Sequence, residues 1–214
     1  MKKIALTILV ILLCSCNKEL TTNNSDQQVQ ISAEITSATL SRVTEDGKAF
    51  SDGDAIKVQN MDRENKNLAT YTYSASAGVW NTTDQLYWDG AANNIFNAWY
   101  PATAEYGTFT IPSDQSSGIA EADWMTASAA ARKADGNVKL AFGHHLAKVT
   151  MTIDAWSNEY DEAEKTVNSL ELKSLSSEMS FDGTLSGDKT AKWIKTYSSK
   201  ENISYLAIIA PGVY

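Results

Sequence analysis

Two adjacent histidines, His144 and His145, are the residues of this sequence best suited to catalysis or metal binding, because imidazole exchanges protons and ligates ions near neutral pH. They are the only histidines in the chain. Neighbouring side chains on a β-strand point to opposite faces, so the pair cannot readily chelate one ion. Asp52-Gly53-Asp54 offers two carboxylates but lacks the later oxygen ligands of a calcium loop, so we predict a turn there. We therefore expect no enzymatic activity, no metal site and no cofactor.

The tryptophans are the second group with chemical potential, since an aromatic face can stack on a sugar ring. The chain has six of them, namely Trp80, Trp88, Trp99, Trp124, Trp156 and Trp193. In a β-sandwich such side chains usually fill the core, and we favour that interpretation. A glycan-binding platform is the alternative.

The N-terminus carries the third chemical signal. Lys2 and Lys3 precede an apolar run at 4–13, which has the size of a secretory signal sequence and is too short to span a bilayer. Both cysteines of the chain, Cys14 and Cys16, lie at the end of this run. The folded part is therefore predicted to contain neither a disulfide nor a cysteine-based metal site.

Leu13-Cys14-Ser15-Cys16 resembles the bacterial lipobox, in which a small residue precedes a cysteine that is acylated and freed by cleavage on its N-terminal side. The resemblance implies cleavage between Ser15 and Cys16 and lipidation of Cys16. Two or three acyl chains, at about 0.8 kcal/mol per buried CH2 group, anchor a protein almost permanently. We expect residues 1–15 to be a lipoprotein signal peptide and residues 16–28 to be a flexible polar tether. An ordinary signal peptide that ends near a cysteine is the alternative.

The overall composition indicates an acidic globular protein. The 214-residue chain is 43% hydrophobic and contains three prolines, so it can bury one or two cores. Its formal net charge is −8, and it has no basic stripe. Because phosphate neutralisation needs clustered Lys and Arg, we expect no nucleic-acid partner.

Alternation of apolar and polar residues predicts strands along most of the chain. In a first strand at 29–36, Val29, Ile31, Ala33 and Ile35 share one face. Asp-Gly turns and polar loops separate the further predicted strands, which cover 55–58, 68–73, 79–80, 86–88, 95–100, 108–111, 123–126, 167–175, 192–197 and 203–210. Many short strands with such turns favour a β-sandwich or barrel.

The stretch 138–153, VKLAFGHHLAKVTMTI, is predicted to join two β units. Its two halves alternate separately, and the phase slips between Gly143 and His145, as at a bulge or bend. We therefore predict an all-β protein with one β-sandwich at 29–137 and a second at 138–214. Since the sequence stops soon after an apolar strand, we expect the second sandwich to be incomplete.

Several motifs occur together in an order typical of one family. They are FSDGDAIKV at 50–58, NIFNAWYP at 94–101, DWMTASA at 123–129, LAFGHHLAKVTMTI at 140–153 and LAIIAPGVY at 206–214. Behind a lipobox, these motifs resemble the fimbrillin-like proteins of Bacteroidetes, which are the subunits of type V pili. The resemblance covers roughly residues 29–214.

The resemblance implies two transthyretin-like, Greek-key β-sandwiches in series, in a lipoprotein of the outer membrane that forms part of an adhesive surface fimbria. It further implies that an arginine-specific protease cuts near the first strand, here at Arg42, and that a strand from another subunit fills the vacated groove. An ordinary surface arginine is the alternative for Arg42. Family members continue beyond the position of Pro211, where donor strands lie, so this chain is expected to accept a strand without donating one.

The partners implied are other fimbrial subunits, outer-membrane lipid through acylated Cys16, and host or bacterial surface ligands. The rival interpretation is a monomeric surface lipoprotein that binds glycan or a protein.

Overall fold

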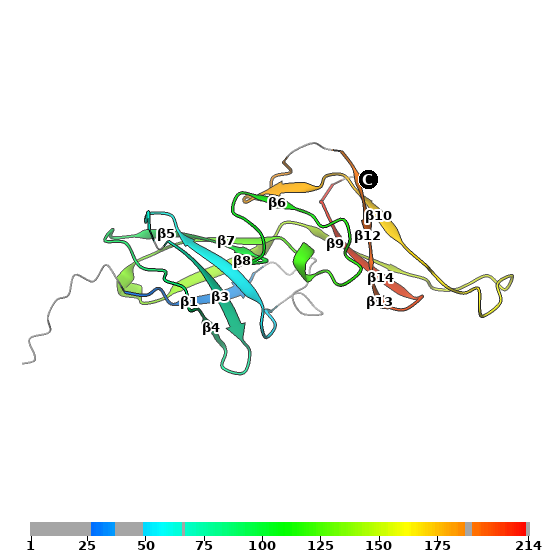
Figure 1. Ribbon diagram of the computed structural model, residues 1–214, viewed down its shortest axis with the longest axis horizontal. Helices are drawn as coiled ribbons and strands as arrows, with labels where there is room; N and C mark the ends of the chain where they lie inside the picture. Colours follow the sequence, from blue (N-terminus) through cyan, green and yellow to red (C-terminus); the bar gives the residue numbers. More distant parts are fainter. Residues whose placement is uncertain (1–26, 37–48, 66, 187–189, 213–214) are drawn as a thin grey trace, which may run out of the picture.

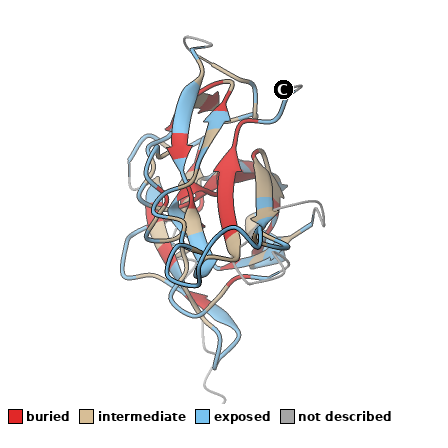
Figure 2. Ribbon diagram, turned by 90° about the vertical axis from the view of Figure 1, so that its right-hand side faces the viewer, coloured by how far each residue is buried: buried red, intermediate tan, exposed pale blue. Residues whose placement is uncertain are grey.

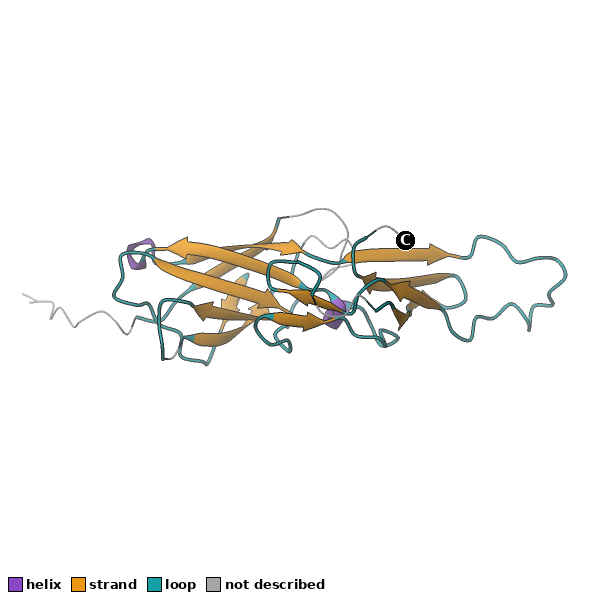
Figure 3. Cartoon of the chain, turned by 90° about the horizontal axis from the view of Figure 1, so that it is seen from above, coloured by secondary structure: helices purple, strands orange, loops and turns teal. Residues whose placement is uncertain are grey.

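The computed structural model describes residues 27–36, 49–65, 67–186 and 190–212, which form β-strands joined by turns and loops (Figure 1). The prediction of an all-β protein is confirmed, and the only helical elements among these residues are the 3-10 turns η2 (Ala120–Ala122) and η3 (Lys133–Asp135). Seen from above, the molecule is elongated, with most strands running along its length (Figure 3). No helix in the described ranges has the length and apolar character needed to cross a membrane.

The largest sheet has seven strands in the order β1-β8-β7-β5-β2-β3-β4. Their bounds are β1 Ile31–Ile35, β2 Ala55–Asn60, β3 Leu68–Ser74, β4 Val79–Asn81, β5 Asn94–Tyr100, β7 Met125–Ala131 and β8 Val138–His144. Only β1 pairs in parallel, with β8, and all other neighbours are antiparallel. The two terminal strands, β1 and β4, contact each other, so the sheet curls around its own core.

Smaller sheets make up the other half of the molecule. β6 (Thr108–Thr110) pairs with β11 (Glu178–Ser180), and β10 (Glu171–Ser174) pairs with β12 (Lys192–Lys195). A three-stranded sheet has the order β13-β14-β9, with bounds β13 Tyr197–Lys200, β14 Ser204–Ile209 and β9 Ala147–Thr152. The segment between β9 and β10 is a long, charged loop, and it projects from one end of the molecule (Figure 3).

The predicted change of sheet within 138–153 is confirmed. β8 belongs to the large sheet, whereas β9 belongs to the three-stranded sheet, and the strand is interrupted at His145 and Leu146. Gly143 itself lies within β8, opposite Thr126. The break therefore falls at the C-terminal end of the phase slip that the sequence shows.

Two clusters of buried apolar side chains fill the molecule, and burial is concentrated on the strands while the loops are exposed (Figure 2). The first cluster lies under the large sheet and includes Ile56, Trp88 and Phe142. The second lies between the smaller sheets and contains Trp99 and Trp124 together with most of β14. Residues on both sides of position 137 thus share the second cluster, and the division into 29–137 and 138–214 stays a prediction.

Four predicted strands differ in the structure, and the one predicted at 123–126 begins at Met125 and extends to Ala131 as β7. Residues 86–88 form no strand, because Tyr87 makes only an isolated bridge with Gln28. The strand predicted at 167–175 is shorter, since the backbone N–H of Val167 donates to the side chain of Asn202 and regular pairing begins only at β10. The strand predicted at 192–197 is divided into β12 and β13, because the chain changes partner there: Thr196 still donates its N–H to the carbonyl oxygen of Leu170, in register with β10, whereas Tyr197 pairs with Leu206 of β14.

Candidate functional site

The candidate site is the place that β1 occupies in the large sheet. Along β1 and the residues before it, buried and exposed positions alternate as the sequence predicts. Val29 and Ile31 are buried, at 0% and 8% exposure, while Ala33 and Ile35 are half-buried. Full burial of such a side chain contributes about 1.5–3 kcal/mol, so the two buried residues supply most of the apolar attachment of this strand.

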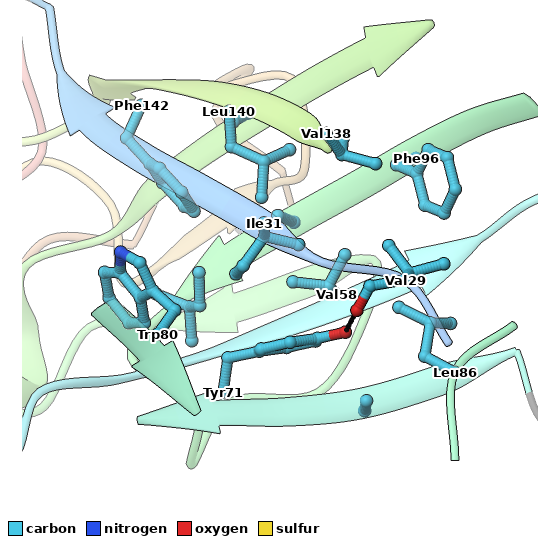
Figure 4. Packing of buried hydrophobic residues seen from close by; sticks show 14 of the residues in the cluster. Val29, Ile31, Val58, Tyr71, Trp80, Leu86, Phe96, Val138, Leu140 and Phe142 are labelled. Atoms are coloured by element: carbon cyan, nitrogen blue, oxygen red, sulfur yellow. Dashed lines mark hydrogen bonds between the residues drawn. The ribbon is translucent and has the colours of Figure 1, made fainter. Parts of the chain in front are cut away.

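We call the side chains that receive β1 the β1 seat, and they come from five parts of the chain: β2, β3, β4, the segment after β4, and β8. In Figure 4, Val29 and Ile31 point into a layer of apolar side chains above and below them. The β1 seat consists of Val58, Tyr71, Trp80, Leu86, Val138, Leu140 and Phe142, all in the first core cluster. If β1 left, these side chains would face solvent together.

Hydrogen bonds hold β1 along one edge and at its N-terminal end. The N–H of Val138 donates to the carbonyl oxygen of Gln30 at 2.9 Å. The N–H of Thr36 donates to the carbonyl oxygen of Phe142 at 3.0 Å. The hydroxyl of Tyr71 donates to the carbonyl oxygen of Val29 at 2.7 Å (Figure 4). Burial, aided by the nearby charge of Asp84, raises the pKa of the Tyr71 phenol, so the group stays protonated as a donor.

The other edge of β1 is open. Because successive residues direct their backbone groups to opposite edges, those of Ile31 and Ala33 face away from β8. β1 ends the strand order, so no strand of the described chain pairs with this edge. A hollow of about 410 Å³ lies there, bounded by Ile31 and Ala33 on one side and by Val79 and Trp80 of β4 on the other. Residues 31–35 are thus attached by one ladder and by their apolar face, whereas just before β1 the N–H of Val29 also donates to the carbonyl oxygen of Leu86 at 2.9 Å.

The two histidines form no shared site. His144 Nδ1 lies 3.0 Å from Asp123 Oδ1, with both side chains buried, whereas His145 Nε2 lies 2.6 Å from Thr126 Oγ1. Burial lowers the pKa of His145, which favours its neutral form. Within the described part of the chain, no group of three or more His, Cys, Asp or Glu side chains is placed to hold a metal ion.

The remaining candidates have structural roles or lie elsewhere. Asp52 Oδ1 accepts a hydrogen bond from the N–H of Ala75 at 2.8 Å, and Asp54 Oδ2 accepts one from the N–H of Ser51 at 2.5 Å, which is the turn chemistry predicted for this segment.

Four tryptophans are buried, as expected for a core, namely Trp80, Trp88, Trp99 and Trp124. Trp193 on β12 is 60% exposed. Ser15, Cys16 and Arg42 lie outside the described residues.

The sequence did not reveal which residues receive β1. Tyr71 and Leu86 contact a strand that lies more than forty positions away, and only their place in alternating runs marked them as apolar core. No local signal links them to Val29.

Comparison with known proteins is consistent with this fold. The model of the family described as fimbrillin-like matches residues 41–214. A search of curated proteins gives no significant match. Among solved structures, the chain is similar to a candidate cell adhesion protein from Bacteroides uniformis, with 20% identity and a TM-score of 0.62 over 88% of this chain and 76% of that one.

Two further structures show the same fold. A candidate cell adhesion protein from Bacteroides ovatus has 18% identity and a TM-score of 0.56, over 86% of this chain and 78% of that one. A candidate adhesin from Bacteroides thetaiotaomicron has 9% identity and a TM-score of 0.52, over 87% of this chain and 71% of that one. Such identities support the fold alone, but the family model spans most of the sequence. The chain belongs to the fimbrillin-like family.

Proposed function

We propose that this protein is a structural subunit or anchor of a cell-surface fimbria of the type V pilus class, assembled by β-strand exchange and supporting adhesion. The observation that carries the proposal is the position of β1, an edge strand that fills an apolar seat and is held by one parallel ladder. Membership of the fimbrillin-like family, and the names of the cell adhesion proteins that share the fold, support the same function.

Proteolysis at Arg42 would start the exchange. Arg42 follows β1 in the sequence, so cleavage there leaves β1 connected to the rest of the fold by non-covalent contacts only. Its departure would expose the β1 seat together with the free backbone groups of β8. An exposed groove with an unpaired strand edge is a site for adding a strand.

A strand from another subunit would then replace β1. Its backbone would restore the ladder on β8, and its alternate side chains would occupy the positions of Val29 and Ile31. Burial of these two side chains contributes about 3–6 kcal/mol in gross terms, before the cost of ordering the strand. Repeated between subunits, this joint would give a stable fibre.

Lipidation of Cys16 would attach the protein to the outer membrane. Residues 16–28 would then separate the acylated end from the first strand. Because Cys16 precedes Arg42, a subunit that is cut there and releases β1 would lose this lipid anchor, so only an uncut subunit would stay attached at the cell surface, where host or bacterial ligands are reached.

The test combines processing with strand addition. The full chain is treated with an arginine-specific protease, alongside the variants Arg42→Lys and Arg132→Lys. Arg132 is a matched control, because it is exposed and paired with Asp135 at the surface. We expect the wild type and Arg132→Lys to be cut after position 42 and Arg42→Lys to resist that cut, as read by mass spectrometry.

The trimmed chain is then mixed with a synthetic peptide of residues 27–36. We expect the peptide to raise the melting temperature, and a peptide that carries Val29→Asp and Ile31→Asp to have no effect. Mixing trimmed chain with sibling subunits should give ladders of SDS-resistant oligomers. A trimmed chain that retains β1 and stays monomeric in these mixtures would contradict the proposal.

The alternative is a monomeric surface lipoprotein that binds glycan or a protein, and Trp193 is the observation that favours it. This side chain is 60% exposed on β12, opposite Lys173 of β10. Exposed aromatic side chains are frequent anchors in binding surfaces. Ligand binding that is lost in Trp193→Ala, together with an absence of oligomers after proteolysis, would favour this function.

A further inference from the structure

A second hollow, distinct from the apolar seat of β1, lies beside the N-terminal end of that strand. We call it the polar hollow. It has a volume of about 350 Å³ and lies between Gln28 and Gln30 on one side and the segment Asn81–Gln85, which leaves β4, on the other. Small-molecule sites span about 300–1,000 Å³, so the polar hollow can hold a ligand of modest size.

The polar hollow is lined by hydrogen-bonding groups that the protein leaves available. Gln30, Asn81, Thr83 and Gln85 all line it, and none of their side chains has a hydrogen-bond partner in the described chain. Each carboxamide offers two N–H donors and one oxygen acceptor, and the hydroxyl of Thr83 can donate or accept a hydrogen bond. These groups suit a ligand with several hydroxyls, because a hydroxyl also donates and accepts.

The walls of the polar hollow are fixed in place by other contacts. Gln28 Nε2 donates to the carbonyl oxygen of Asp84 at 2.8 Å, which ties the segment after β4 to the residues before β1. Asp84 Oδ2 accepts the N–H of Thr70 at 2.7 Å, and the N–H of Asp84 donates to Thr82 Oγ1 at 3.0 Å. A segment held in this way loses less entropy when a ligand binds.

Charge and burial narrow the class of ligand. Asp84 is the one charged residue that lines the polar hollow, and the chain has a formal net charge of −8, so an anionic ligand is disfavoured. Of the three aromatic residues that border the polar hollow, Trp80 and Tyr71 are buried, at 7% and 1% exposure, and the half-buried ring of Tyr87 is covered by the guanidinium of Arg63, 5.3 Å from its centroid. We propose that the polar hollow binds a neutral sugar residue of a surface glycan, through hydrogen bonds from its amide and hydroxyl side chains.

The site requires β1 but does not require strand exchange. Gln28 and Gln30 lie directly before β1 in the chain, so the polar hollow is complete only while β1 is in its seat. A sugar bound there would stabilise the form that contains β1, by the general linkage between binding and structure. Binding to the intact chain is therefore a test that holds whether or not the subunit polymerises.

The experiment measures sugar binding by the purified full chain. The probes are oligosaccharides that end in glucose, galactose, mannose, fucose or N-acetylglucosamine, with oligosaccharides that end in sialic or glucuronic acid for comparison. Binding is measured on an immobilised set and then by titration calorimetry. We expect at least one neutral probe to bind and the acidic probes to bind more weakly or not at all.

Variants locate the binding site. Gln30→Ala combined with Gln85→Ala removes two amide side chains and is expected to weaken binding by about tenfold or more, at roughly 1 kcal/mol for each lost hydrogen bond. Gln27→Ala is the matched control, an exposed glutamine that does not line the polar hollow. Since the altered side chains are exposed, the melting temperature should not change in any of these variants.

Three results would overturn the proposal. They are the absence of binding to every neutral probe, binding that the double variant leaves unchanged, and binding that is lost in Trp193→Ala instead. A preference for acidic probes would also exclude the neutral-sugar assignment.

Discussion

The side-chain amide of Gln115 pairs with the backbone of Ile208 as a strand would. Gln115 Nε2 donates to the carbonyl oxygen of Ile208 at 2.8 Å, and Gln115 Oε1 accepts its N–H at 2.8 Å. The backbone of the same segment is hydrogen-bonded to β12. The N–H of Gln115 donates to the carbonyl oxygen of Lys195 at 3.0 Å, and the N–H of Lys195 donates to the carbonyl oxygen of Ser113 at 2.8 Å. Ser113–Gln115 therefore links β12 to β14 and joins two small sheets.

Replacing Gln115 should destabilise this half of the protein. Gln115→Ala leaves the N–H and C=O of Ile208 buried without partners, at a cost of about 1–3 kcal/mol for each group. We expect the free energy of unfolding, measured by urea denaturation, to fall by a few kcal/mol. Gln27→Ala, at an exposed position, should change it by less than about 0.5 kcal/mol. Equal losses in the two variants would show that the Gln115 pairing adds no stability.

Gly183 and Gly53 provide a matched pair for testing close packing. Both have left-handed backbones, with φ of 84° and 87°. An added Cβ at Gly183 would overlap the ring of His145, whereas at Gly53 it would meet open space. Gly53→Ala should lower the free energy of unfolding by about 1–2 kcal/mol because of the backbone conformation alone. Gly183→Ala should lower it by about 1–3 kcal/mol more because of the overlap. Thermal denaturation of both variants checks the difference, and equal costs would contradict the predicted clash.

The buried pair of Asp123 and His144 should be strongly coupled. Both side chains are almost fully buried, so removing one leaves the other without this hydrogen bond, at a cost of about 1–3 kcal/mol or more. We expect His144→Ala to lower the free energy of unfolding by this amount. The double variant His144→Ala with Asp123→Asn should lower it by less than the sum of the two single variants, as measured in a double-mutant cycle. The exposed pair Arg132 and Asp135 is the control, with an expected coupling of about 0.2–1 kcal/mol. A similar coupling in the two pairs would argue against the role of burial.

His145 should make stability fall at acidic pH. Burial lowers its pKa below the ordinary value of 6.5, so the unfolded chain takes up a proton before the folded chain does. The stability that the neutral side chain of His145 contributes is fully present above pH 6.5. It is lost progressively as the pH falls from 6.5 through the lowered pKa. Unfolding in urea at several pH values between 5 and 8 should show this loss in the wild type and a smaller loss in His145→Gln. Identical pH profiles would rule out His145 as the cause.

Truncating the buried face of β1 should loosen the strand. Ile31→Ala removes a side chain that is 8% exposed and should cost about 2–5 kcal/mol. Glu34→Ala, on the exposed face of the same strand, should cost less than about 0.5 kcal/mol. Hydrogen exchange of the amide of Val138, which donates to Gln30, should accelerate in the first variant only. Unchanged protection in Ile31→Ala would show that the apolar face does not hold β1.

Much of the local structure was determined by the sequence alone. Alternating runs such as 29–36 predict strands because exposure on a strand repeats every second residue, and this pattern depends on neighbouring positions only. Asp-Gly turns at Gly53, Gly136 and Gly183 follow from the backbone freedom of glycine, and all three have positive φ in the structure, whereas Gly90 of the Asp89-Gly90 pair does not. The change of sheet near His145 was also visible, because the alternation itself shifts phase there.

Tertiary structure decided which strands meet. The parallel pairing of β1 with β8, the seat built by Tyr71 and Leu86, and the link between Gln115 and Ile208 all join residues that are far apart in the chain. An alternating run specifies which face is buried but not which strand lies beside it, since backbone hydrogen bonds are the same for every sequence. Partners are chosen by the packing of whole faces and by the connections between strands, and these exist only once the chain has folded.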